Sequence, residues 1–172
     1  SADRIFENAG TLTASGGTVF FNLGNLGGGA VINNLAGATF DVQGETDFSH
    51  NFGSVSAFNN AGLFRKTGGG TTTFSNNRIA FNNTGTVEII SGSLQLNGGG
   101  TNTGTFTSES AGTLDLGGNT FSSGDTATVT LQGPLTVSGG TASFAGPATA
   151  LGTITAAGGS LAFNGPLTNG NA

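Results

Sequence analysis

Residues 133–144 read GPLTVSGGTASF, and residues 152–163 read GTITAAGGSLAF. The second stretch repeats the first at a constant offset of 19 residues, and the match continues through the Gly-Pro pairs at 146–147 and 165–166. Each unit consists of short pieces in which apolar and polar residues alternate, separated by corners that contain glycine. Self-similarity at a fixed period of this size is typical of a solenoid.

The same unit recurs in looser form toward the N-terminus. A first piece follows a glycine corner, a second piece alternates with period two, and a third piece is more variable. With the corner glycine as origin, about seven units begin near residues 10, 37, 62, 85, 104, 133 and 152, in a single domain spanning residues 1–172. We expect the unit that begins at Gly104 to carry an inserted loop at residues 122–125.

The pieces predict strands that pair with their own copies. They alternate with period two and are bounded by Gly, Asn or Ser, as strands are. Hairpins would instead join two neighbouring strands through a short turn. The predicted fold class is all-β, a single parallel β-helix (β-solenoid) of about seven three-sided coils, with corner glycines that supply positive φ. One inward apolar row is expected to contain Phe21, Phe48, Phe74, Leu96, Leu116, Phe144 and Phe163.

Two polar rows follow from this register. The outward residues after the first apolar residue of successive units are Thr13, Asp41, Arg65, Glu88 and Thr107. Their charges alternate along the axis, which favours adjacent strands in this register. Asparagines recur before the corners and predict a ladder of stacked amides. These asparagines are Asn8, Asn33, Asn34, Asn59, Asn60, Asn82, Asn83 and Asn102.

Three segments show a resemblance to a known group of proteins, and the resemblance extends over nearly the whole chain. The segments are residues 58–64 (FNNAGLF), 81–87 (FNNTGTV) and 91–96 (SGSLQL). The chain resembles bacterial secreted β-helix (β-solenoid) repeat proteins, namely autotransporter passenger regions and filamentous haemagglutinin-like adhesins. The resemblance implies an extracellular location at the bacterial cell surface and a mechanical role. It implies no catalytic residues, because these families share none.

Composition excludes several classes of protein. The chain has 172 residues with 33 Gly, no Cys and only 8 % charged residues, and its formal net charge is −5. Glycine at this density disfavours helices, and four basic residues cannot form a nucleic-acid-binding stripe. A disulfide scaffold and a thiolate zinc site are excluded because both need cysteine, which the chain lacks. The apolar runs are too short to span a bilayer, so we expect no membrane insertion.

We expect no catalytic, metal-binding or cofactor-binding residues, and therefore no cofactor. Asp47 and Asp115 are predicted to lie about three coils apart, roughly 14 Å, which is too far for a catalytic pair. Asp41 and Glu88 are expected to be separated by Arg65. His50 is the only histidine and is expected on a loop after Phe48.

Threonine pairs raise the alternative of an ice-binding face. The pairs include Thr71/Thr73, Thr105/Thr107 and Thr153/Thr155. They do not share one position in the unit, so we predict no single flat threonine face.

The strongest functional signal is that no charged residue follows Asp125. Solenoid ends normally need caps, and edge strands normally carry charges. Three explanations remain open: a segment of a longer repeat protein, a subunit that stacks head to tail on copies of itself, or a coil with frayed ends.

The predicted function is a non-enzymatic, extracellular structural β-solenoid. It would act as a head-to-tail filament subunit or as the stalk or adhesive part of a bacterial surface protein. The expected partners are other coils at its ends and, in addition, surface glycans. The alternative is a carbohydrate-binding or polysaccharide-degrading β-helix protein.

Overall fold

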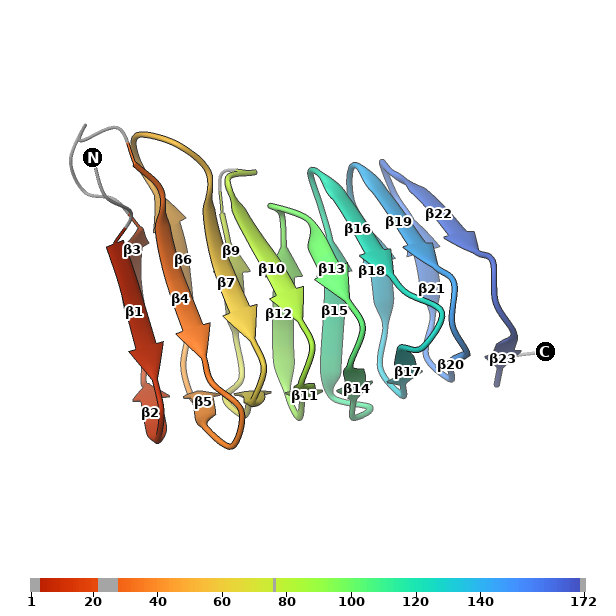
Figure 1. Ribbon diagram of the computed structural model, residues 1–172. Helices are drawn as coiled ribbons and strands as arrows, with labels where there is room; N and C mark the ends of the chain where they lie inside the picture. The colour runs from red at the N-terminus through yellow and green to blue at the C-terminus, as the bar shows by residue number, and fades with distance from the viewer. Residues whose placement is uncertain (1–3, 22–27, 76, 171–172) are drawn as a thin grey trace.

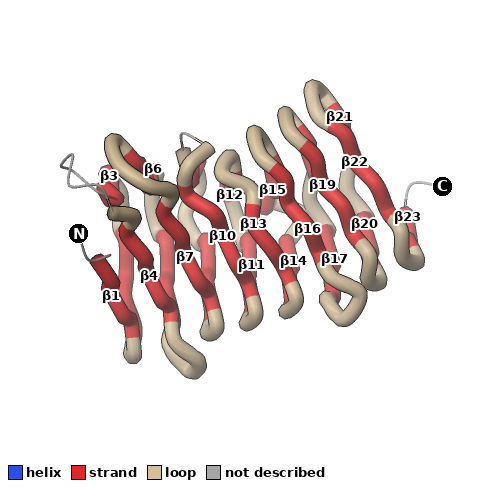
Figure 2. The backbone as a smooth tube through the Cα atoms, turned by 45° about the horizontal axis from the view of Figure 1, so that its top comes forward, coloured by secondary structure: helices blue, strands red, loops and turns tan. Residues whose placement is uncertain are grey.

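The computed structural model describes residues 4–21, 28–75 and 77–170. These residues form 23 strands in three sheets, here named sheets A, B and C, and the strands within each sheet are parallel. Figure 1 shows the chain winding through the three sheets in a fixed order, so that every third strand belongs to the same sheet. Loops connect the strands at the corners of each turn (Figure 2).

Sheet A consists of β1 (Arg4–Asn8), β4 (Ala30–Asn34), β7 (Ser56–Asn60), β10 (Ile79–Asn83), β13 (Gly100–Asn102), β16 (Thr120–Ser123), β19 (Thr141–Phe144) and β22 (Ser160–Phe163). Sheet B consists of β2 (Thr11–Ala14), β5 (Thr39–Val42), β8 (Leu63–Lys66), β11 (Thr86–Ile89), β14 (Thr105–Ser108), β17 (Thr128–Leu131), β20 (Ala148–Ala150) and β23 (Leu167–Asn169). Sheet C consists of β3 (Gly17–Phe21), β6 (Thr46–His50), β9 (Thr71–Phe74), β12 (Gly92–Leu96), β15 (Gly112–Leu116), β18 (Leu135–Val137) and β21 (Ile154–Ala156).

This architecture confirms the predicted fold class, an all-β parallel solenoid of about seven three-sided turns. The described residues contain no helix, and so no helix among them is long and apolar enough to cross a membrane. The 19-residue repeat is also confirmed, because Leu135 pairs with Ile154 and Phe144 pairs with Phe163.

The core is a stack of inward rows that runs along the axis. In sheet C, Phe48 and Phe74 lie face to face, with ring centroids 4.3 Å apart and an interplanar angle of 5°. In sheet A, Phe58 and Phe81 stack at 5.4 Å and 7°. All four side chains are fully buried, and burial of each contributes roughly 1.5–3 kcal/mol. Alternation within each strand places the polar neighbours of these rings on the outside.

The predicted inward row is correct in its middle and wrong at its ends. Phe48, Phe74, Leu96 and Leu116 are paired in this order in sheet C. The row then continues through Val137 and Ala156, while Phe144 and Phe163 belong to sheet A.

At the N-terminal end of the same row, Val19 pairs with Phe48, and Phe21 pairs with His50. Phe21 still contacts the Phe48 ring, at a centroid separation of 6.4 Å. Alternation alone did not show which of the two residues continues the row, because both have the same parity.

The predicted unit starts near residues 133 and 152 lie at a different corner of the coil from the earlier unit starts. The strands after Gly133 and Gly152 are β18 and β21 of sheet C, whereas the strands after Gly62, Gly85 and Gly104 belong to sheet B. The sheet B strands of the last two turns are β20 and β23, which follow the Gly-Pro corners. The segment 122–125 is also not an inserted loop, because Ser122 and Ser123 complete strand β16.

Most corner glycines before the strands of sheet B are required because the backbones of successive turns approach closely there, and not because of their φ angle. Gly37 has a φ of 81°. Gly62, Gly85 and Gly104 do not have positive φ, but a Cβ on each would overlap a backbone carbonyl oxygen of the preceding turn. The predicted role of these glycines is therefore wrong at three of the corners, where the reason is space.

Turn length changes along the axis. Equivalent asparagines are 26 residues apart in the first two steps, then 23, and then 19. The strands keep their pairing while the corners shorten, which explains why the repeat is clear at the C-terminus and loose at the N-terminus.

Candidate functional site

The predicted charged row lies on the outer surface of sheet B. Thr13, Asp41, Arg65, Glu88 and Thr107 are paired in this order across five strands. Arg65 Nε donates to Glu88 Oε2 at 2.9 Å, and both side chains are partly exposed. An exposed pair of this kind contributes about 0–1 kcal/mol.

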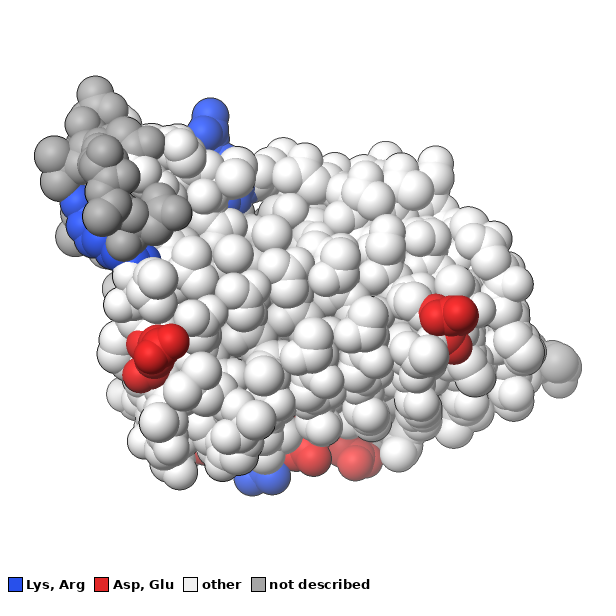
Figure 3. Space-filling model, viewed as in Figure 1, with Lys and Arg blue, Asp and Glu red and all other residues white. Residues whose placement is uncertain are grey.

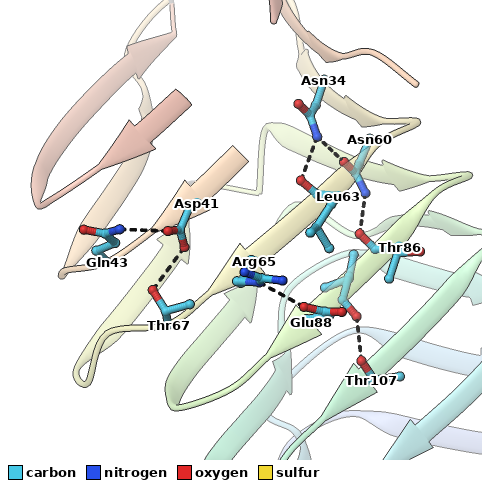
Figure 4. Close-up of polar contacts among 11 residues, drawn as sticks. Asn34, Asp41, Gln43, Asn60, Leu63, Arg65, Thr67, Thr86, Glu88 and Thr107 are labelled. Carbon is cyan, nitrogen blue, oxygen red and sulfur yellow. Dashed lines mark hydrogen bonds and ion pairs between the residues drawn. The ribbon is translucent and has the colours of Figure 1, made fainter. Parts of the chain in front are cut away.

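Asp41 has partners other than Arg65. Its carboxylate accepts hydrogen bonds from Gln43 Nε2 at 2.8 Å and from Thr67 Oγ1 at 3.0 Å (Figure 4). The register of the row is therefore confirmed, and the ion pair of Arg65 is with Glu88. These groups satisfy one another and form a structural row.

Two amide ladders run side by side along sheet A. In the inner ladder each Nδ2 donates to the next Oδ1 toward the C-terminus, at 2.7–2.8 Å, from Asn8 through Asn34, Asn60 and Asn83 to Asn102. Asn102 Nδ2 then donates to Ser123 Oγ at 3.0 Å. The same Nδ2 groups also donate to backbone carbonyls of the next turn, such as Leu63 and Thr86 in Figure 4.

The outer ladder points in the opposite direction. Asn59 Nδ2 donates to Asn33 Oδ1 and Asn82 Nδ2 donates to Asn59 Oδ1, each at 3.0 Å. The inner asparagines are buried and the outer ones are partly exposed. Both ladders confirm the predicted amide stacking.

His50 lies inside the solenoid, so the prediction that it lies on a loop is wrong. Its side chain ends β6 with 2 % exposure, and Nδ1 is 3.0 Å from Ser56 Oγ. Ser56 Oγ also accepts the Ala30 N–H at 3.1 Å. Burial lowers the pKa of His50, a backbone hydrogen bond with Gly53 opposes this, and the charge of Arg78 lowers it further. Both side chains are enclosed, so this histidine and serine form a polar contact within the core of the solenoid.

Lys66 is a buried cation that the sequence analysis missed. It ends β8 with 0 % exposure, and its Nζ donates to the carbonyl oxygens of Gly68 and Gly69. Burial lowers the pKa of Lys66, and the nearby charge of Glu45 partly opposes this. Strand parity contained the signal, because Lys66 lies two residues after the inward Phe64.

The predicted separation of the acidic residues is confirmed. Asp47 and Asp115 are three strand steps apart in sheet C, with Thr73 and Gln95 between them. Asp115 accepts hydrogen bonds from Gln95 and Ser138. The described residues contain no cluster of three or more His, Cys, Asp and Glu that could hold a metal ion.

Threonines follow two different sheets. Thr105 and Thr107 of β14 pair with Thr128 and Thr130 of β17 in sheet B, whereas Thr73 and Thr155 are in sheet C. The prediction that no single face collects the threonine pairs is confirmed.

One shallow, uncharged groove crosses the corner between sheets C and A. It has a volume of about 640 Å³, and its lining includes Gly98, Gly100, Gly118 and Gly140. Hydroxyl and amide side chains along it are Thr101, Asn119, Thr120, Ser122 and Thr141. Figure 3 shows that the surrounding face carries few charged side chains.

The N-terminal end of the core is open in the described part of the chain. A concave apolar opening of about 510 Å³ is lined by residues that include Phe6, Leu12, Val19, Phe21 and Phe40. Phe6 pairs with the inward residue Ile32, yet it is 49 % exposed. The first strands of sheets A, B and C each have a described neighbour on one side only.

The C-terminal end has the same character. Leu167 occupies the inward row of sheet B next to Ala148, yet it is 40 % exposed. Leu161 and Phe163 of β22 are partly exposed, although Ala142 and Phe144 beneath them are buried. Inward apolar side chains are therefore exposed at both ends of the described solenoid.

Comparison with models of protein families, with curated proteins and with solved structures found no match. The fold therefore rests on the strand pairing, and the bacterial, secreted origin remains a prediction from the resemblance.

Proposed function

We propose that this chain is a non-enzymatic structural β-solenoid that lengthens by stacking its open ends on further coils. In the first instance it is a head-to-tail filament subunit. The same ends join flanking repeats when such a solenoid is part of a longer stalk or adhesin. The coarser description, a structural repeat protein, follows from the fold itself.

One observation carries the proposal: inward apolar side chains are exposed at both ends, as Phe6 and Leu167 illustrate. In a solenoid each turn buries its apolar row against its neighbours, so an end without a neighbour leaves that row in water. Within the described residues, the strands beside these side chains have a neighbour on one side only in all three sheets. A further coil would satisfy the backbone and the apolar row together.

Charge distribution supports stacking at the C-terminal end. Natural edge strands are usually protected by charged residues, but no charged residue follows Asp125. Strands β21, β22 and β23 therefore present no charge that would oppose strand addition. A contact between unlike ends does not close on itself and so generates a filament.

The interior and the acidic rows support a non-enzymatic role. Ser56 and His50 are enclosed, and Asp47 and Asp115 lie three strand steps apart. A glycoside hydrolase needs two carboxylates within about 5–10 Å.

The proposal is tested by the concentration dependence of light scattering together with negative-stain electron microscopy. We expect unbranched fibres for the natural sequence and dispersed particles for Phe6→Glu and Leu167→Glu, because each variant places a carboxylate in the joint. Thr130→Glu, on the outer face of β17, is the matched control and should still form fibres. A natural chain that remains monomeric at high concentration would refute self-assembly.

Glycan binding is a second candidate, favoured by the groove over the corner between sheets C and A. Its hydroxyl and amide side chains suit neutral sugars. A glycan array tests it: Thr141→Tyr, which fills the groove, should abolish any signal that Thr130→Tyr leaves intact. Absence of any signal for the natural chain would reject this candidate.

The location at the bacterial cell surface rests on the resemblance of the repeat. Labelling of intact, unpermeabilised cells with an antibody to the chain tests it directly. Labelling that requires permeabilisation would refute an extracellular location.

A further inference from the structure

The outer surface of sheet A is uncharged along almost its whole length. Of the 4 basic and 9 acidic residues of the chain, only Arg4 and Glu7, both in β1, lie in the described strands of sheet A. Sheets B and C carry charged residues in several strands, for example Asp41 in β5 and Asp47 in β6. The outward side chains of the other seven strands of sheet A are here named the uncharged face; these strands are β4, β7, β10, β13, β16, β19 and β22. Figure 3 shows this face toward the viewer, with no charged side chain across its middle.

The uncharged face is built from small side chains at regular intervals. In β7 and β10 the outward residues are an alanine and an asparagine in each strand, and like residues are paired. The outward residues of β13, β16 and β19 are all threonine or serine. No outward side chain in these five strands is larger than asparagine, and the strands are spaced about 4.8 Å apart. The face is therefore a set of low, evenly spaced ridges.

The amides on this face are already hydrogen-bonded within the chain. Asn82 Nδ2 donates to Asn59 Oδ1 at 3.0 Å, and Asn82 Oδ1 accepts from Thr101 Oγ1 at 3.2 Å. Asn59 Nδ2 in turn donates to Asn33 Oδ1 at 3.0 Å. Burial of a polar group is costly where its hydrogen bonds are lost. Covering this face would keep these bonds and would remove no charge from water.

We propose that the uncharged face binds the uncharged face of a second copy of this chain, so that two solenoids lie side by side. Both copies have the same strand spacing, so the ridges of one fit between the ridges of the other along the whole face. Paired sheets with small side chains and amide ladders interlock in this way.

The area of the face is sufficient for a specific contact. Its seven strands have three to five residues each. At about 4.8 Å per strand and about 3.3 Å per residue, they cover about 500 Å² on each copy. Two such faces bury about 1,000 Å², which is the area expected of a specific protein interface. The contact involves neither end of the solenoid and is therefore independent of end-to-end stacking.

An end-blocked variant separates this contact from stacking. In sedimentation velocity, we expect Leu167→Glu to show a reversible monomer–dimer equilibrium without larger species, because an interface between like faces closes at two copies. Thr101→Glu in the same background should raise the dimer dissociation constant about tenfold or more, because it places like charges in the contact. Thr130→Glu in that background, on the outer face of sheet B, is the matched control and should leave the dimer unchanged. Circular dichroism confirms that each variant is folded.

Charge reversal gives a second measurement. Thr101 lies in β13, the middle strand of the seven, so a two-fold axis through the face brings both copies of this residue near each other. In the end-blocked background, a mixture of Thr101→Glu and Thr101→Arg proteins should restore the dimer that neither forms alone.

The outcomes distinguish this contact from the proposed function. An end-blocked protein that stays monomeric at high concentration, or a dimer that Thr101→Glu does not weaken, would overturn the side-by-side contact and leave the filament intact. A monomeric protein whose glycan signal is lost on Thr101→Glu would assign the face to a sugar ligand and would also overturn the contact. A natural chain that forms dimers but no fibres would refute the filament and support the contact.

Discussion

At the residue scale, the inner asparagine ladder shows how a polar side chain can occupy the core of a solenoid. Asn60 accepts from Asn34, donates to Asn83 and donates to the Thr86 carbonyl, so its amide is satisfied on both sides. A buried polar group is unfavourable only where its partners are missing. The ladder therefore fixes the register between turns, because a shift by one residue would separate every pair.

Replacement of Asn60 by alanine tests the inner ladder. We expect Asn60→Ala to reduce the free energy of unfolding by about 1–3 kcal/mol, since it leaves buried partners unsatisfied. The measurement is urea denaturation followed by circular dichroism.

Asn59→Ala is the matched control on the outer ladder. It also removes two amide hydrogen bonds, but water can reach the partly exposed partners, so we expect a change within about 0.5 kcal/mol. Equal losses in the two variants would contradict a special role for the buried ladder.

His50 predicts a dependence of stability on pH. Burial lowers the pKa of His50 in the folded state, so below about pH 6.5 the unfolded chain binds a proton that the folded chain does not. Stability from this group is complete above pH 6.5 and falls as the pH drops toward the depressed pKa.

The expected loss is at most about 1.4 kcal/mol between pH 6.5 and 5.5, because one pKa unit corresponds to 1.36 kcal/mol. Urea denaturation at both values measures it. His50→Gln, which does not titrate, should lose less stability over the same interval. An identical pH dependence in both proteins would show that the carboxylates alone are responsible.

At the element scale, strands and corners contribute differently to the stack. The strands supply inward rows with a constant spacing, and the corners absorb the change in turn length from 26 to 19 residues. Corner glycines of sheet B let the backbone of one turn approach the next. The Thr86 N–H donates to the Gly62 carbonyl and the Thr105 N–H to the Gly85 carbonyl, each at 2.9 Å.

Gly85→Ala tests this close approach. A Cβ at Gly85 would overlap the backbone of Ala61 and Gly62, so we expect a loss of about 1–3 kcal/mol in the free energy of unfolding, as for an overpacked core. Thermal denaturation measures the loss.

Gly69→Ala is the matched control, because nothing lies within 4 Å of its added Cβ and its φ is not positive. There we expect no loss, or a gain of about 0.4–1 kcal/mol from the reduced entropy of the unfolded chain. Comparable losses at both sites would mean that glycine is needed for flexibility and not for space.

At the scale of the whole molecule, each strand pairs with its copies in the neighbouring turns, so stability is distributed along one axis. The inward side chains of the middle turns, such as Phe58 and Phe81, are fully buried, whereas Phe6 and Leu167 at the ends are not. The terminal strands therefore gain less from burial than the central ones.

Amide hydrogen exchange should follow this gradient. We expect the amides of β10 and β11 to exchange most slowly and those of β2 and β23 to exchange fastest in dilute, unassembled protein. Assembly should slow exchange in the terminal strands, β2 and β23 among them, because stacking gives each of them a new neighbour. Uniform protection along the axis would contradict a stability that decays toward open ends.

Several particular residues could be placed from the sequence, and others could not. The row of Thr13, Asp41, Arg65, Glu88 and Thr107 was predicted correctly, because like positions recur after each corner. The assignment of Phe144 and Phe163 to sheet C was wrong. Their parity was right, but the variable corner lengths hid which of the three sheets each strand joins.

The sequence analysis also failed to place two polar side chains in the interior. His50 was expected on a loop, and the burial of Lys66 was missed. Composition makes a charged or titratable side chain look exposed, whereas strand parity places both of them inside. The direction of each side chain along its strand therefore outweighs its preference for water. Burial disfavours the charged form, and it lowers the pKa of both His50 and Lys66.

The sequence by itself determined that this chain is a stack of like rows, because alternation sets the inward face and recurrence pairs each strand with its own copy. Only the tertiary structure decided which corners need glycine and which polar side chains lie inside. Those features depend on how closely successive turns approach and on which sheet each strand joins, and the spacing of residues along the chain encodes neither.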